Sequence, residues 1–161
     1  MHDMLPLLNA LDFPAIRRGP LQALQVNLTY QCNQRCLHCH VNAGPTRTEA
    51  MTDESLALLL QVIDAHAVQT LDLTGGAPEM HPRFREIVRH ARAAGLRVID
   101  RCNLTILSEP GFEDLADFLA GQQVEISASL PCYSRDNVDK QRGDGVFDKS
   151  TVFADGMMFP E

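Results

Sequence analysis

The chain has 161 residues, a formal net charge of -7 and a hydrophobic content of 45%. An acidic chain without a basic patch argues against a nucleic-acid-binding protein, and its apolar runs are too short to cross a membrane. The first residues contain no basic segment of the kind that opens a secretory signal, so we expect a cytoplasmic protein with reduced thiols. Five cysteines are also an odd number for a disulfide framework, which favours metal or redox chemistry.

Short apolar segments alternate with helix-like segments along the chain. Strands are predicted at residues 24–30, 70–74, 96–100 and 124–130. Helices are predicted between them, at residues 52–67, 82–95 and 111–121. Short links in such an alternation imply parallel strands with right-handed crossovers. We therefore predict an α/β fold, a partial parallel (βα) barrel of about four βα units. It should not close, because a closed barrel of eight units needs roughly 250 residues.

The pattern also divides the chain. Residues 1–23 are predicted to be an N-terminal lead-in and residues 24–150 a partial core domain. The alternation ends after Tyr133, and residues 151–161 read as a divergent or disordered tail, neither a convincing helix nor a strand. Because strands that would complete the cavity of a full barrel are missing from the pattern, we expect this chain by itself to turn over little.

Residues suited to chemistry follow each predicted strand. Three cysteines follow the first strand, Gly75 and Gly76 the second, Cys102 and Asn103 the third, and Cys132 the fourth. In parallel α/β folds the carboxyl ends of the strands form the functional rim. All five cysteines are therefore expected on one rim.

Cys32, Cys36 and Cys39 have the spacing C-x3-C-x2-C. Thiolates select iron-sulfur clusters, zinc or Cu(I). A cluster of four irons held by three thiolates leaves one iron open to a small molecule, which explains three thiolates rather than four. Zinc is the alternative, since His40 could complete a Cys3His set. Adjacent residues seldom both reach one tetrahedral ion, and no second C-x2-C pair exists, so the spacing favours the cluster.

The second strand ends in TGGAPE, residues 74–79. Glycine at a strand end permits unusual dihedral angles and a close approach of ligand to backbone. A plain turn is the simpler interpretation of two glycines alone.

Together these stretches resemble the radical S-adenosylmethionine (SAM) superfamily. Within it, the chain resembles the arsenosugar-biosynthesis subgroup through LQVNLTYQCNQRCLHCHVNAGP, TLDLTGGAPE, VIDRCNLTILSEPG, ASLPCY and NVDKQRGDGVF, about residues 15–150. Members of that subgroup are about twice as long, and the ending TVFADGMMFPE departs from their pattern.

The resemblance implies roles for individual residues. Cys32, Cys36 and Cys39 match the ligands of a [4Fe-4S] cluster. The residues that match SAM-binding positions are His38, Gly75, Gly76, Glu79, Asn103, Ser129 and Arg142. In the superfamily motif an acid directly follows the two glycines, whereas here Ala77 and Pro78 precede Glu79.

The resemblance also implies an activity. The cluster would cleave SAM to a 5'-deoxyadenosyl radical, and the subgroup would add the deoxyadenosyl group to a methylated trivalent arsenical. Because arsenic(III) binds thiols, Cys102 and Cys132 are the candidate catalytic contacts with this small-molecule substrate. The electron would come from a donor such as flavodoxin or ferredoxin, and no nucleic acid or membrane partner is expected.

Two other classes of function remain open at this point. One is a non-catalytic module that binds a metal or metalloid through the cysteine rim. The other is an interaction protein with a structural zinc ion. Neither has a use for a methionine-binding strand end, so the TGGAPE segment favours the enzyme.

Overall fold

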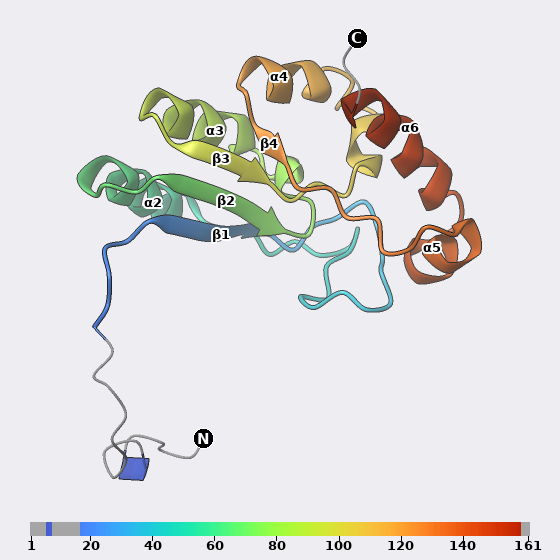
Figure 1. Cartoon of the computed structure of the whole chain (residues 1–161), viewed down its shortest axis with the longest axis horizontal. Coiled ribbons are helices and arrows are strands. Elements are labelled where there is room, and N and C mark those ends of the chain that lie inside the picture. Colours follow the sequence, from blue (N-terminus) through green and yellow to red (C-terminus); the bar gives the residue numbers. More distant parts are fainter. Residues whose placement is uncertain (1–5, 8–16, 159–161) are drawn as a thin grey trace.

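The computed structural model describes residues 6–7 and 17–158, and describes only the backbone of residues 153–158. Within these residues one parallel sheet has the order β1-β2-β3-β4. Its strands are β1 (Ala23–Thr29), β2 (Thr70–Gly75), β3 (Arg97–Asp100) and β4 (Glu125–Ile126). The sheet does not close, which confirms the predicted α/β fold (Figure 1).

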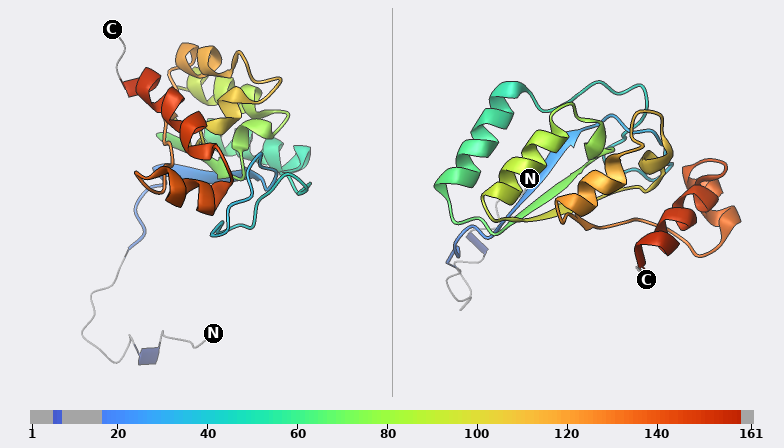
Figure 2. Two further views of the ribbon diagram at one scale, coloured as in Figure 1. Left: turned by 90° about the vertical axis from the view of Figure 1, so that its right-hand side faces the viewer. Right: turned by 90° about the horizontal axis from the view of Figure 1, so that it is seen from above.

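Three helices lie side by side over one face of this sheet (Figure 2, right). They are α2 (Asp53–Ala65), α3 (Phe84–Ala93) and α4 (Leu115–Gly121). Two short 3-10 turns, η1 (Pro78–Met80) and η2 (Thr105–Ser108), follow β2 and β3. Two further helices, α5 (Arg135–Arg142) and α6 (Val146–Met158), stand beyond the carboxyl ends of the strands.

The core lies between the sheet and these helices. Alternate strand residues, such as Leu71 and Leu73 of β2, are fully buried against the helices. In α3 the residues Phe84, Ile87 and Val88 fall at helical spacing and are buried to the same degree. Each such side chain contributes about 1.5–3 kcal/mol through burial, which fixes the face that each strand presents to the helices.

The opposite face of the sheet is polar. The register places Gln25 of β1 beside Asp72 of β2, and Gln25 Nε2 donates to Asp72 Oδ2 over 3.0 Å. Arg101, which directly follows β3, pairs with the same carboxylate at 2.7 Å. Because none of the described helices covers this face, polar pairs rather than apolar side chains occupy it.

Several predicted boundaries differ from the structure. The fourth strand was predicted at 124–130 but pairs only at Glu125–Ile126. β4 is an edge strand, so only β3 of the described strands pairs with it, and the conformation of the residues after Ile126 depends on loop contacts. The third helix begins at Leu115 rather than at residue 111, and the second begins at Phe84, after Pro82. Thr52 caps α2 as expected and accepts a hydrogen bond from Ser55 N.

The alternation ends after Tyr133 as expected, but two helices follow, and as far as Met158 α6 contradicts the prediction that residues 151–161 are neither helix nor strand. Helix α5 buries only Val138, so it lacks the apolar stripe by which sequence patterns reveal a helix. Contacts with α6, including an ion pair between Arg135 and Asp148, stabilise α5 in place of an apolar stripe. The predicted domain limits at residues 23 and 150 remain predictions, and most of the lead-in and the last residues of the tail lie outside the described residues.

None of the helices in the described part of the chain is both long enough and apolar enough to span a membrane bilayer.

Candidate metal centre

The three cysteines of the predicted cluster site lie in the loop that follows β1. Backbone hydrogen bonds close this loop: Cys32 N donates to Gly44 O over 3.2 Å, and Gly44 N donates to Tyr30 O over 3.1 Å. At its tip, Cys39 N donates to Cys36 O over 3.3 Å. These backbone hydrogen bonds hold the loop that carries the three cysteines in a closed conformation.

A cavity of about 330 Å³ lies at the carboxyl ends of the strands, beside this loop. It is lined by most of the residues predicted from the sequence: Cys32, Cys36, Cys39, His38, Gly75, Gly76, Asn103, Ser129 and Arg142. These residues come from five separate segments of the chain. The structure thus brings the predicted cluster ligands and all the predicted SAM-binding residues except Glu79 to one site.

The cysteine sulfurs receive hydrogen bonds that suit thiolate ligands. Cys32 Sγ accepts from Gln34 N at 3.4 Å and from Asn103 Nδ2 at 3.6 Å. Cys39 Sγ accepts from Ala43 N at 3.3 Å. Donors of this kind offset the negative charge of a sulfur bound to a metal.

Burial has the opposite effect, because it disfavours the thiolate form of these cysteines. It raises the pKa of the Cys32 thiol, despite the hydrogen bond from Gln34 N. Burial also raises the pKa of Cys36, although the guanidinium of Arg142 partly opposes the shift. Burial therefore favours the neutral thiols, and binding of a metal ion would favour the thiolates instead.

The two glycines are required by the chain's own packing. A Cβ on Gly76 would lie 2.3 Å from Gln31 O, and one on Gly75 would lie 2.4 Å from Thr29 O. Gly75 also has a φ of +136°. Gly76 N donates to Thr29 O over 2.8 Å. The glycines thus let β2 pass directly against the segment that leads into the cysteine loop, while both still line the cavity.

Asn103 connects the end of β3 to the cysteine loop. Its Nδ2 donates to Asn33 Oδ1 over 2.8 Å, and its Oδ1 accepts from Ile106 N over 3.1 Å. Gln34, which is 5% exposed, donates to Thr105 Oγ1 over 2.8 Å in the same network. Sequence reasoning missed Gln34, although a polar residue between two cluster ligands is itself a signal.

Arg142 and Ser129 meet at the other side of the cavity. Arg142 Nη1 donates to Ser129 O over 2.8 Å. Helix α5 places Arg142 there, and Gln141 O in the same turn accepts from Leu37 N of the cysteine loop over 3.0 Å. The helix that the sequence did not reveal therefore closes the site.

Arg101 is a second lining residue that sequence reasoning missed. It follows β3 directly and is held by Asp72, at 2.8 Å from Nε and 2.7 Å from Nη2. The Arg101 guanidinium lowers the pKa of Asp72, so the pair stays charged at neutral pH. Its place before Cys102 and Asn103 at a strand end is the signal that could have found it.

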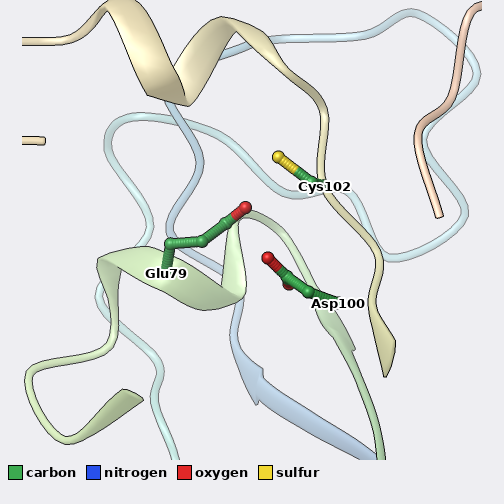
Figure 3. A group of neighbouring side chains, drawn as sticks. All are labelled: Glu79, Asp100 and Cys102. Atoms are coloured by element: carbon green, nitrogen blue, oxygen red, sulfur yellow. The ribbon is translucent and has the colours of Figure 1, made fainter. Parts of the chain in front are cut away.

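Glu79 and Cys102 are not among the residues that line the cavity. Both are buried on the helix-covered side of the sheet, next to Asp100 (Figure 3). Burial raises the pKa of Cys102, with the nearby carboxylates adding to the shift. The expectation that all five cysteines share one rim is wrong for Cys102.

Cys132 lies in the loop before α5 and is partly exposed. It also does not line the cavity. Its sulfur is 3.5 Å from Ser134 Oγ and accepts from Asn137 Nδ2 at 3.6 Å. The hydrogen bond with Ser134, together with that from Asn137, lowers the pKa of Cys132. Cys102 and Cys132 therefore occupy different surroundings, one a buried thiol and one a partly exposed thiol with a lowered pKa.

Comparison with known families places these features in context. The family model described as Radical SAM superfamily matches residues 26–150. A probable GTP 3',8-cyclase of Saccharolobus solfataricus is 29% identical over 133 residues, which is 81% of this chain and 41% of that protein. A probable GTP 3',8-cyclase of Metallosphaera sedula is 33% identical over 81 residues, 50% of this chain and 26% of that protein.

Solved structures share the fold. A structure of anSMEcpe with bound AdoMet covers 85% of this chain and 40% of that one, with a TM-score of 0.67 and 19% identity. Streptococcus suis SuiB bound to S-adenosylmethionine covers 84% and 30%, with a TM-score of 0.63 and 16% identity. This chain thus spans about two fifths of the length of the first relatives it matches.

Proposed function

Because this chain belongs to the radical SAM superfamily, we propose that it binds a [4Fe-4S] cluster through Cys32, Cys36 and Cys39, and SAM beside it. The observation that carries this proposal is the shared cavity, which the three cysteines line together with Gly75 and Gly76. A volume of about 330 Å³ lies at the lower end of the range for small-molecule sites. The test is the EPR spectrum of the reduced cluster with and without SAM.

When bound, the cluster supplies one electron to the sulfonium of SAM, whose cleavage yields the 5'-deoxyadenosyl radical. The chain's own residues bind and position. Asn103 and the loop amides stabilise the thiolates. Gly75 and Gly76 line the cavity, where their backbone would contact the methionine end of SAM, and Arg142 and Ser129 line the side toward α5.

The substrate we propose is a methylated trivalent arsenical, to which the deoxyadenosyl group is added, as in the arsenosugar-biosynthesis proteins that the sequence resembles. The relatives named as GTP 3',8-cyclases raise GTP as the other candidate. Only two cationic side chains, Arg101 and Arg142, line the described cavity. Arg101 is already paired with Asp72, which leaves Arg142 as the described cation able to contact a phosphate; the proposal of an arsenical rests on the sequence resemblance.

Cys132 is the better of the two proposed arsenical contacts. Arsenic(III) binds thiolates, and the lowered pKa of Cys132 favours that form at neutral pH. Cys102 is 0% exposed and has a raised pKa. The structure therefore supports one accessible thiol near the rim rather than a pair of thiols.

Replacing Cys132 with serine should weaken the binding of a methylated trivalent arsenical by about tenfold or more, because the thiolate contact is lost. Equilibrium binding to the chain loaded with its cluster measures this affinity. Cys102→Ser is the matched control and should change it less than twofold. Equal loss in both variants would contradict the assignment to Cys132, and formation of a cyclised GTP product would contradict the arsenical.

An external one-electron donor, such as flavodoxin or ferredoxin, is also part of the proposal, because none of the described residues is a source of electrons. A cytoplasmic location, inferred from the cysteine content, remains a prediction.

A further inference from the structure

Three acidic groups converge inside the core, away from the cavity. Glu79 comes from η1, Asp100 is the last residue of β3, and Cys102 follows two residues later. One carboxylate oxygen of each acid and the Cys102 sulfur all lie within 4.8 Å of one another. Figure 3 shows the two carboxylates pointing toward each other, with the thiol beside them.

Burial raises the pKa of both carboxyl groups, and no group of opposite charge among the described residues neutralises them. Glu79 is 5% exposed and Asp100 is 0% exposed, yet none of their four carboxylate oxygens has a hydrogen-bond partner in the described part of the chain. No described basic side chain forms an ion pair with either acid. Burying an unpaired carboxylate costs several kcal/mol, and ionised carboxylates cannot donate to each other. Only added protons or a cation can therefore hold these groups together.

We propose that Glu79, Asp100 and Cys102 form a second metal site, which binds one Zn(II)-like divalent ion inside the core. One thiolate and two carboxylates suit an ion of borderline softness, whereas Mg²⁺ and Ca²⁺ take oxygen ligands and Cu(I) prefers sulfur. Leu104 N already donates to Cys102 Sγ over 3.3 Å, as expected for a sulfur that carries negative charge when it binds a metal.

The geometry is close to what such an ion requires. Bond lengths of about 2.3 Å to sulfur and 2.0–2.2 Å to oxygen place tetrahedral ligand atoms roughly 3.5 Å apart. The three observed ligand atoms lie within 4.8 Å of one another, so side-chain torsions can bring them to this spacing. Each carboxylate has a second free oxygen, so a bidentate contact can fill the fourth position. Binding converts the Cys102 thiol to a thiolate and releases its proton.

The ion would join two walls of the cavity. Glu79 lies three residues after Gly76, and Asn103, which follows Cys102, donates to Cys32 Sγ. A metal bound here would fix the turn after β2 to the end of β3, behind the cluster loop. This inference does not rest on the cluster or on SAM, so the two proposals can fail separately.

Cobalt(II) is the probe, used on the full chain with Cys32, Cys36 and Cys39 all replaced by serine. We expect one cobalt ion per chain and a sulfur-to-cobalt charge-transfer band in the near ultraviolet. Adding Cys102→Ser should abolish the band, and adding Glu79→Gln should weaken binding at least tenfold. Cys132→Ser is the matched control and should leave both unchanged. A band that survives Cys102→Ser, or no binding of cobalt, would overturn the proposal.

Thermal stability provides a second test of the site, which stays informative if one of these variants folds poorly. Zinc at a hundred times its dissociation constant should raise the melting midpoint of the triple-serine chain by about 5–10 °C. Asp100→Asn, added to that chain, keeps the side-chain shape and removes a buried charge, so it should fold and show no such rise. If zinc leaves the midpoint of the triple-serine chain unchanged, the acids are held by shared protons and the proposed site does not exist.

Discussion

Replacing Cys32, Cys36 and Cys39 together with alanine should lower the iron bound after anaerobic reconstitution by at least about tenfold relative to the parent chain. All three sulfurs line the same cavity, and two of them already accept backbone hydrogen bonds. The other two cysteines, Cys102 and Cys132, do not line it. Iron and sulfide analysis, normalised to folded protein, measures the effect.

The matched control is Cys132→Ala, which removes a thiol outside the cavity. Iron content in that variant should stay within twofold of the parent chain. If the triple variant keeps its iron, or if Cys132→Ala loses as much, the cysteine loop is not the cluster site.

Replacing Gly76 with alanine should have the second large effect. The added Cβ would lie 2.3 Å from Gln31 O and 3.1 Å from Ala43 Cβ. The first contact is with backbone, so the cysteine loop or the end of β2 must move. We expect a loss of about 3 kcal/mol in the free energy of unfolding, measured by urea denaturation, together with weaker SAM binding.

Gly121→Ala provides the control for this substitution. Gly121 lies in α4, has no heavy atom within 4 Å of an added Cβ, and does not have a positive φ. Alanine there should leave stability unchanged or raise it by up to about 1 kcal/mol, because it favours the helix. A Gly76 variant as stable as this control would contradict the packing role.

The parts of the fold that the sequence predicted are those with strong periodicity. Leu71 and Leu73 alternate in β2, and Phe84, Ile87 and Val88 follow the helical repeat of α3. Helix α5 could not be predicted in this way, because it buries only Val138 and depends on contacts with α6. Whether such a helix forms depends on its tertiary contacts.

The candidate site also had parts that the sequence could predict and parts that it could not. The spacing of Cys32, Cys36 and Cys39 sufficed to predict shared ligation, because a short loop brings its members together. It was harder to predict on which side of the sheet a residue lies once its strand has ended. Asn103 reaches the cavity while Cys102, one residue earlier, is buried beneath the helices. Side chains continue to alternate between the two faces of the sheet beyond the last paired residue of β3. This alternation determines which of the two residues reaches the cavity.

The most direct test of the account is the EPR spectrum of the reconstituted, reduced chain recorded with and without SAM. We expect about four irons per cluster-loaded chain, because three thiolates match a four-iron cluster with one open iron, and a spectrum that SAM changes. A spectrum that SAM leaves unaltered, or a site that takes up zinc in place of iron, would contradict the assignment of this cavity to cluster and SAM.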